Sequence, residues 1–394
     1  ASLGYLTYLK NKAATDVESL LDMTEEKIGE IAKNVLEGSS FKNIPQDLSP
    51  ELAQQLYGDR IETSVSQLET YYQNSFEYFL NYGLHLKKRF ENELDVIQAG
   101  NYYHETFDYL VKRIKEKKLN FADLTEEKLG ELLIEVREEL KEEGRYRQLL
   151  NDPFNKYLFH KLDQTTANVA HYWHSNVNKT TFRPQYSELS FGKNQKVSGL
   201  SYSWKDDNNK KKIVDLRGKM DRVDLAQVND RVLGEVIDYK SSAKKFDLGL
   251  FANGISMQMI SYLEVLKNNN KFFAQGKDLD VLGAFYQSIT SSLERLSSEK
   301  MILSNYQIKD LAKESTKKLM YNGILIADEE MLDLIEPGME KDRAVSDLYT
   351  SVKRKVNGDI SWPQNQSFTP DQLDLLLASV SYTHLRAHET RRHL

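Results

Sequence analysis

The stretch from Gly218 to Lys240, GKMDRVDLAQVNDRVLGEVIDYK, most constrains how this chain can fold, because it contains two segments of alternating and β-branched residues. Such segments predict two strands. Asp221 lies at the end of the first predicted strand, and Asp238 follows the apolar run of the second. The separation of these acids along the chain is enough for a hairpin that places the two carboxylates side by side.

The chemistry of these side chains indicates a metal site. Two neighbouring carboxylates repel each other unless a cation lies between them. Alternation along a strand places Asp238 and Lys240 on the same side. Hydrolysis of a phosphodiester needs carboxylates that hold Mg²⁺ and a further cation that positions water and stabilises developing charge. Asp221, Asp238 and Lys240 therefore have the layout of a metal-dependent nuclease, whereas an Asp-x-Lys sequence alone is as well explained by a surface pair.

A helix is predicted downstream, from about residue 248 to 267, and residues 280–289 read as one more strand. Gln258 and Tyr262 are four residues apart and share a face of this helix. They can reach a phosphate or a metal-bound water. The alternative for both is ordinary polarity on a helix surface.

The remaining chain predicts an α/β arrangement, with helices before and after the sheet. Strand-like segments begin near residue 185. Before them, apolar residues recur at helical spacing after the cap candidates Asp123 and Thr125, and a second such pattern follows Thr24. The members of the two patterns are Leu129, Leu132, Leu133, Val136 and Leu140, and Ile28, Ile31, Val35 and Leu36.

Composition limits the class of protein. A length of 394 residues, 40% hydrophobic and 28% charged, is ordinary for a soluble globular protein of two or three domains. No apolar run is long enough for a transmembrane helix and no signal peptide is recognisable, so we expect a cytoplasmic protein without membrane contact. With no cysteine, the chain must hold any metal through oxygen and imidazole ligands.

The net charge of −6 is unusual for a nucleic-acid-binding protein. Contacts with DNA must therefore come from local basic clusters. The candidates are residues 87–89, 112–118 and 210–212. For each cluster, a solvated group of surface charges is at least as good an interpretation.

The segments GKMDRVD, VIDYKSS and GISMQMISYL resemble the core of the RecB-type branch of the PD-(D/E)xK nucleases. Residues 64–89 and 99–110 are similar to the opening of the nuclease region in AddB/RexB, the B subunits of the bacterial ATP-dependent helicase-nucleases. NGILIADEEML also matches. The resemblance covers about residues 61–378. It implies a mixed central sheet flanked by helices, with a helical insertion at about 110–184 and a sheet core at about 185–290.

The resemblance also implies a ligand set. His104, Asp221, Asp238 and the carbonyl of Tyr239 would hold Mg²⁺ or Mn²⁺, and Lys240 would orient the attacking water. Gln258 and Tyr262 match the family's helix motif and would contact the DNA strand. Taken by itself, His104 is better explained as a core histidine.

The implied activity is that of a 5′→3′ exonuclease, which hydrolyses the 5′-ended single strand during double-strand-break processing for homologous recombination. The implied partner is the AddA/RexA helicase-nuclease subunit, in a heterodimer. ATP would be used by that complex, since no phosphate-binding loop of the G-x-x-x-x-G-K-[ST] type occurs in this chain. Two alternatives remain: a catalytically idle nuclease fold that binds the partner and guides DNA, and a nuclease that acts without a motor.

The chain departs from the family pattern in two respects. Many AddB proteins hold an iron-sulfur cluster through four cysteines, and Asn74 stands at the position of the first, so we expect no cluster, as in the RexB form. The family's last segment is replaced after about residue 378. We therefore expect residues 1–60 to be the helical end of a helicase-like region, the nuclease domain to be truncated at its C-terminal end, and residues 379–394 to be an adapter-derived tail.

Overall fold

The computed structural model describes residues 48–87, 94–206, 209–289 and 317–389, with the side chains of the last helix described as far as Ser379. The helix predicted after Thr24 and the basic residues Lys88 and Arg89 lie outside the described residues. Within the described ranges, no helix is both long enough and apolar enough to cross a membrane.

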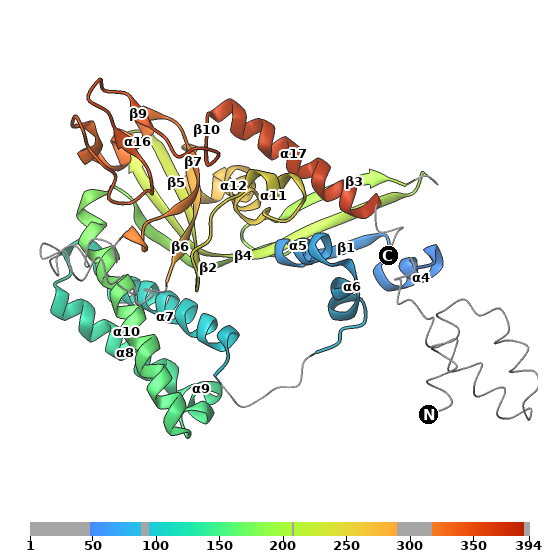
Figure 1. Ribbon diagram of the computed structural model, residues 1–394, viewed down its shortest axis with the longest axis horizontal. Helices are drawn as coiled ribbons and strands as arrows, with labels where there is room; N and C mark the ends of the chain where they lie inside the picture. The colour runs from blue at the N-terminus through green and yellow to red at the C-terminus, as the bar shows by residue number, and fades with distance from the viewer. Residues whose placement is uncertain (1–47, 88–93, 207–208, 290–316, 390–394) are drawn as a thin grey trace, which may run out of the picture. The chain divides into compact units, whose positions relative to one another are not determined.

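A mixed sheet of eight strands forms the centre of the described chain (Figure 1). Its order is β1-β4-β5-β6-β7-β10, and β2 and β3 also pair with β4. Strand β4 is antiparallel to β2, β3 and β5, whereas the β1–β4, β5–β6 and β7–β10 pairs are parallel. The strands are β1 (Arg60–Ser64), β2 (Arg183–Phe191), β3 (Leu200–Lys205), β4 (Lys211–Val228), β5 (Arg231–Lys240), β6 (Asp278–Ser288), β7 (Asn322–Ile326) and β10 (Ser367–Phe368), and a separate pair is formed by β8 (Lys353–Arg354) and β9 (Ile360–Ser361).

Strand β4 spans 18 residues and changes partners along its length. Its first part pairs with β1 and β3, and its second part pairs with β2 and β5. Gly218 lies where β4 changes partners. A Cβ added there would stand 2.6 Å from Cζ of the buried Phe191. The predicted hairpin of β4 and β5 is confirmed, but the prediction that Asp221 ends its strand is wrong, because β4 continues past Asp221 to pair with β5.

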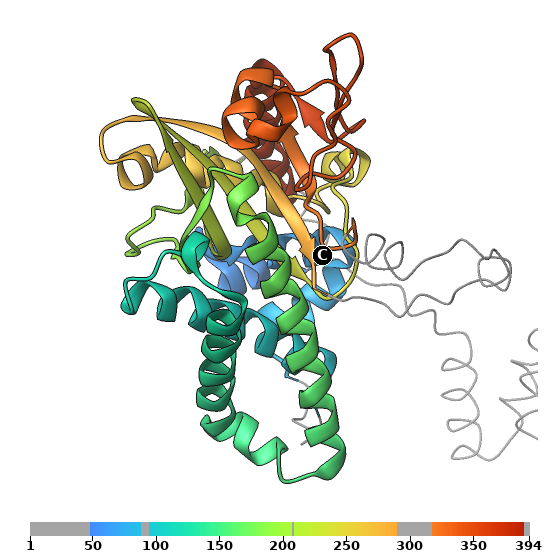
Figure 2. The ribbon, with the colours of Figure 1, turned by 90° about the vertical axis from the view of Figure 1, so that its left-hand side faces the viewer.

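Four helices lie together at one end of the sheet (Figures 1 and 2). Helix α8 confirms the predicted helix: Thr125 accepts a hydrogen bond from Lys128 N at 3.2 Å, and all five predicted apolar positions are buried. Helix α7 packs against α8, α10 and β2. The four helices are α7 (Val96–Glu116), α8 (Glu126–Glu142), α9 (Gly144–Leu149) and α10 (Pro153–Asn176).

The connection between the parallel strands β5 and β6 contains three helices, α11 (Leu248–Ala252), α12 (Gln258–Asn268) and α13 (Asn270–Ala274). The single helix predicted from 248 to 267 is therefore wrong. Gly254 has a φ of 78°, a left-handed conformation that interrupts a helix. The strand predicted at 280–289 is confirmed as β6.

Helices α5 and α17 flank other parts of the sheet, where α5 contacts β1 and β4 and α17 contacts β3 and β10. Helix α17 contacts α5, α12 and β3. The remaining helices are α4 (Pro50–Tyr57), α5 (Val65–Gln73), α6 (Ser75–Tyr78), η1 (Phe79–Gly83), η2 (Phe121–Asp123), η3 (Val177–Lys179), α16 (Glu329–Ile335), η4 (Pro337–Glu340) and α17 (Pro370–Glu389).

Candidate active site

Two acids face each other across the β4–β5 hairpin. Arg222 pairs with Ile237, so the antiparallel register places Asp221 opposite Asp238. The backbone N–H of Tyr239 donates to Asp221 Oδ2 at 2.7 Å. Asp221 is 7% exposed and Asp238 is 2% exposed. The hairpin therefore holds two carboxylates close together in a site that is largely shielded from water.

Three side chains fix Asp238. Gln258 Nε2 donates to Asp238 Oδ1 at 2.8 Å and also lies 2.8 Å from the Tyr262 hydroxyl, which donates to Lys219 O. Lys240 Nζ lies 2.6 Å from Asp238 Oδ2. Burial, and next the Asp221 carboxylate, raise the pKa of Asp238 to about 6. Burial alone would lower the pKa of Lys240, but the Asp238 carboxylate outweighs it and the net direction is upward.

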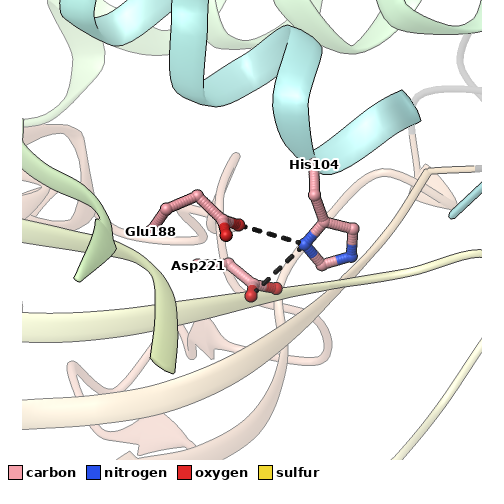
Figure 3. Close-up of side chains that lie close together, drawn as sticks. All are labelled: His104, Glu188 and Asp221. Atoms are coloured by element: carbon pink, nitrogen blue, oxygen red, sulfur yellow. Dashed lines mark ion pairs between the residues drawn. The ribbon is translucent and has the colours of Figure 1, made fainter. Parts of the chain in front are cut away.

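His104 reaches this site from helix α7. Its Nδ1 lies 3.3 Å from Asp221 Oδ1 and 3.4 Å from Glu188 Oε1 (Figure 3). Burial opposes protonation of the imidazole, but the two carboxylates outweigh burial and raise the pKa of His104 to about 10. The three side chains come from α7, β2 and β4, which lie far apart in the sequence.

Glu188 was not predicted as a site residue from the sequence. It lies on β2 opposite Asp221, because Ser187 pairs with Arg222 and Leu189 with Met220. Its φ of 48° is a left-handed conformation that is uncommon for a residue with a Cβ, especially within a strand. The only signal in the sequence is an acid within the predicted strand YSELSF. The pairing with Asp221 could not be read from it, because β2 contains an irregularity near its start.

The donor set fits a hard divalent cation. The ligand atoms of His104, Glu188 and Asp221 all lie within 4.8 Å of one another. Glu188 Oε1 is buried without a hydrogen-bond partner of good geometry. Carboxylate oxygens with one imidazole suit Mg²⁺ or Mn²⁺ better than they suit thiophilic metals. His104 and Asp221, together with Asp238, Lys240, Gln258 and Tyr262, line a cleft of about 570 Å³, whereas Glu188 is not among its lining residues.

The opposite face of the hairpin anchors Tyr239. Its ring stacks on Trp173 with centroids 5.7 Å apart and also contacts Phe107 and His104. The guanidinium of the fully buried Arg222 lies 4.6 Å from the Trp173 ring. This packing fixes the backbone between Asp238 and Lys240, and it joins helices α7 and α10 to the site.

Comparison with protein families gives a match over residues 62–353 to the PD-(D/E)XK nuclease superfamily. The match covers most of the chain and includes His104, Glu188, Asp221, Asp238 and Lys240. The chain belongs to the PD-(D/E)XK nuclease superfamily. This confirms the predicted fold class, and the mixed sheet with its flanking helices is the superfamily core.

Curated relatives of this nuclease domain are named as the B subunit of an ATP-dependent helicase/deoxyribonuclease. The chain is 98% identical over 382 residues to the protein of Lactobacillus johnsonii and 50% identical over 386 residues to that of Lactobacillus helveticus, covering 97% of this chain in both cases. It is 30% identical over 370 residues, or 93% of the chain, to the protein of Lactiplantibacillus plantarum. The chain spans about a third of the length of these relatives, 33%, 33% and 30% respectively. The resemblance to the B subunits is thereby confirmed.

The structure brings most of the predicted site residues of the nuclease domain into one cleft. His104, Asp221, Asp238, Lys240, Gln258 and Tyr262 all line it. Gln258 and Tyr262 contact Asp238, and their predicted contact with DNA stays a prediction. The same holds for a cation bound by the Tyr239 carbonyl.

Proposed function

We propose that this domain hydrolyses phosphodiester bonds of single-stranded DNA with a divalent cation, Mg²⁺ or Mn²⁺. The observation that carries the proposal is the meeting of Asp221, Asp238, Lys240 and His104 in one cleft. Membership of a nuclease superfamily supports it. So does the name of the relatives, which includes a deoxyribonuclease activity.

We assign the cation to His104, Asp221, Asp238 and the Tyr239 carbonyl, with Glu188 as an additional carboxylate beside them. Bound there, the cation would offset the charge of the carboxylates and polarise the scissile phosphate. Gln258 holds Oδ1 of Asp238 in place through its amide. The anchored ring of Tyr239 keeps the intervening backbone fixed.

Lys240 acts on the water and on the developing charge. Its raised pKa keeps Nζ protonated at neutral pH, so it serves as a hydrogen-bond donor and not as a general base. Asp238 holds Nζ at 2.6 Å, and 28% of the Lys240 side chain remains exposed to the cleft. From this position Nζ donates to the oxygen of the attacking water and stabilises the negative charge that builds up on the phosphate.

We further propose that the domain works within a helicase-nuclease complex in the cytoplasm. Its partner there would be the AddA/RexA protein, which would use ATP to unwind duplex ends. The domain would cut the 5′-ended strand in the 5′→3′ direction, during end processing for homologous recombination. Support comes from the names of the relatives, which combine helicase and deoxyribonuclease in the name of one B subunit.

The test uses the complete B subunit assembled with its partner, on duplex DNA labelled separately on each strand. Asp238→Ala and Lys240→Ala are each expected to abolish Mg²⁺-dependent cutting of the 5′-ended strand while ATP-dependent unwinding continues. Unchanged cutting of both strands in these variants would mean that the domain is an idle scaffold that binds the partner and guides DNA.

A further inference from the structure

The cleft continues beyond the carboxylates along strand β4. Arg217 and Lys219 precede Asp221 at intervals of two residues, so all three side chains point to the same face. These three side chains form a row in which neighbours are about 7 Å apart, because a strand rises about 3.4 Å per residue. This distance is comparable to the separation of successive phosphates in an extended single strand. All three residues line the cleft.

The turn after β2 adds another cation to this row. Gly192 has a φ of 148°, and an added Cβ would lie 2.9 Å from Cβ of Arg217, so the turn lies directly against the row. Lys193 follows it, is exposed and lines the same cleft. Among the described residues, no carboxylate pairs with Lys193.

Several members of the basic clusters that the sequence suggested are paired with acids. Lys112 pairs with Asp108 at 2.7 Å, and Arg113 pairs with Glu135 and Glu139. Lys210 and Lys212 both pair with Asp59, at 2.6 and 2.5 Å. These pairs offset part of the positive charge of both clusters, in a chain of net charge −6.

The basic side chains beside the cleft are more accessible to a ligand than the paired residues of these clusters. Arg217 contacts Glu62 at 3.3 Å, but the two side chains are 57% and 45% exposed, and such pairs are weak. Lys219 is 53% exposed and pairs with Glu188, beside the proposed cation site. Apart from Glu62, the acids that line the cleft are Asp221 and Asp238 of the proposed cation site, and Lys193 and Arg217 lie further along it.

We propose that Lys193, Arg217 and Lys219 form a phosphate track, which binds the backbone phosphates next to the one that is cut. The inference rests on the proposed nuclease function and adds to it a binding site for the neighbouring nucleotides. Contacts to phosphates position a strand without reading its sequence. The track therefore accepts single strands of any sequence.

The test measures binding of the full chain to a fluorescent oligothymidylate of about a dozen nucleotides, by anisotropy in Ca²⁺ at several salt concentrations. Each phosphate contact to a single strand contributes about 0.7 to the salt slope, so Lys193→Ala/Arg217→Ala should lower the slope by about 1.4 and weaken binding roughly 25-fold at 0.1 M salt. Glu62→Gln should tighten binding, because it frees Arg217. The matched control is Lys205→Ala/Lys271→Ala, which removes two exposed lysines outside the cleft.

A second substrate separates this inference from the nuclease proposal. Thymidine 5′-(p-nitrophenyl phosphate) has one phosphate and cannot reach the track, so Lys193→Ala/Arg217→Ala should hydrolyse it in Mn²⁺ at the wild-type rate. If wild type hydrolyses it while the double variant keeps wild-type affinity and salt slope for the oligonucleotide, the track is wrong and the nuclease site stands. If wild type hydrolyses neither substrate, the proposed function fails, and the slopes still decide whether the row binds phosphates.

Discussion

Glu188 combines a left-handed backbone with a carboxylate directed at His104 and Asp221. A residue with a Cβ in this conformation costs of order 1 kcal/mol, and such residues cluster at functional sites. The cost is offset if the carboxylate is needed where the backbone places it. We therefore infer from this backbone conformation that Glu188 has a role in cation binding.

Glu188→Gln tests that role, because the amide keeps the size of the side chain and removes its charge. We expect Mn²⁺ affinity, measured by isothermal titration calorimetry, to fall by about 10-fold or more, as changes around metal ligands commonly do. Glu105→Gln is the control, because Glu105 lies next to His104 on α7 and pairs with Arg145 and Tyr146 outside the cleft. Equal affinities in both variants would remove Glu188 from the site.

Glu235 makes stability depend on pH. Burial, and next the Asp224 carboxylate, raise the pKa of Glu235 from 4.5 to about 8, although the Tyr349 hydroxyl donates to it. The folded state therefore binds a proton that the unfolded state releases between these values. The contribution of Glu235 to the free energy of unfolding is fully present below about pH 4.5 and is lost as pH rises toward 8.

Glu235→Gln keeps an acceptor for Tyr349 and cannot ionise. Urea unfolding of wild type should show the free energy of unfolding falling by a few kcal/mol between pH 5 and 8, and the variant should show a smaller fall. Asp238, Glu336 and His104, whose pKa values are raised to about 6, about 7 and about 10, account for a remaining slope of the same sign. A variant as pH-dependent as wild type would show that Glu235 ionises normally.

At the scale of elements, β4 determines how the site is assembled. One continuous strand pairs with β5, which carries Asp238 and Lys240, and with β2, which carries Glu188. The change of partners at Gly218 requires that Phe191 approach the backbone closely. A side chain at position 218 would force these strands apart next to the cleft.

Gly218→Ala is expected to destabilise the protein by roughly 1–3 kcal/mol, since the added methyl meets the Phe191 ring at 2.6 Å. Gly130→Ala is the matched control. It lies within α8 with no atom inside 4 Å of the added Cβ, and it should stabilise by about 0.5–1 kcal/mol through helix propensity. Thermal unfolding measures both, and a neutral Gly218→Ala would contradict the close packing at the change of partners.

Sequence patterns predicted the elements that are determined by residues close together in the chain. Thr125 with five spaced apolar residues predicted α8, and alternation predicted the hairpin that joins Asp221 to Asp238. The break at Gly254 was missed, because a single glycine within an apolar helical pattern does not specify its φ. The length of β4 was missed because strand pairing, and not composition, determines where a strand ends.

The site required information of longer range. His104 was identified only by resemblance to a family, since nothing in the sequence around it distinguishes a ligand from a core histidine. Glu188 was missed because its place opposite Asp221 depends on the register of β2. The phosphate track was missed because Lys193 and Arg217 are not part of a cluster in the sequence and meet only in the folded chain.

At the scale of the whole molecule, the distribution of charge is more informative than its sum. Several basic residues away from the cleft are paired with acids, whereas Lys193, Arg217 and Lys219 are largely exposed beside the carboxylates. A chain of net charge −6 can therefore still present accessible cations to DNA at this cleft. The proposed helicase-nuclease complex would deliver the strand to this cleft.

The most direct test of the account is the hydrolysis of a labelled single-stranded oligonucleotide by wild type and Lys240→Met, with Mg²⁺ and with a chelator. Lys240 is not among the proposed ligands, so we expect Lys240→Met to bind the cation as wild type does, yet to cleave at least about 100-fold more slowly. Wild type should cleave only with the cation. Cleavage by Lys240→Met at the wild-type rate, or by wild type in the chelator, would contradict the assignment of this cleft as a cation-dependent nuclease site.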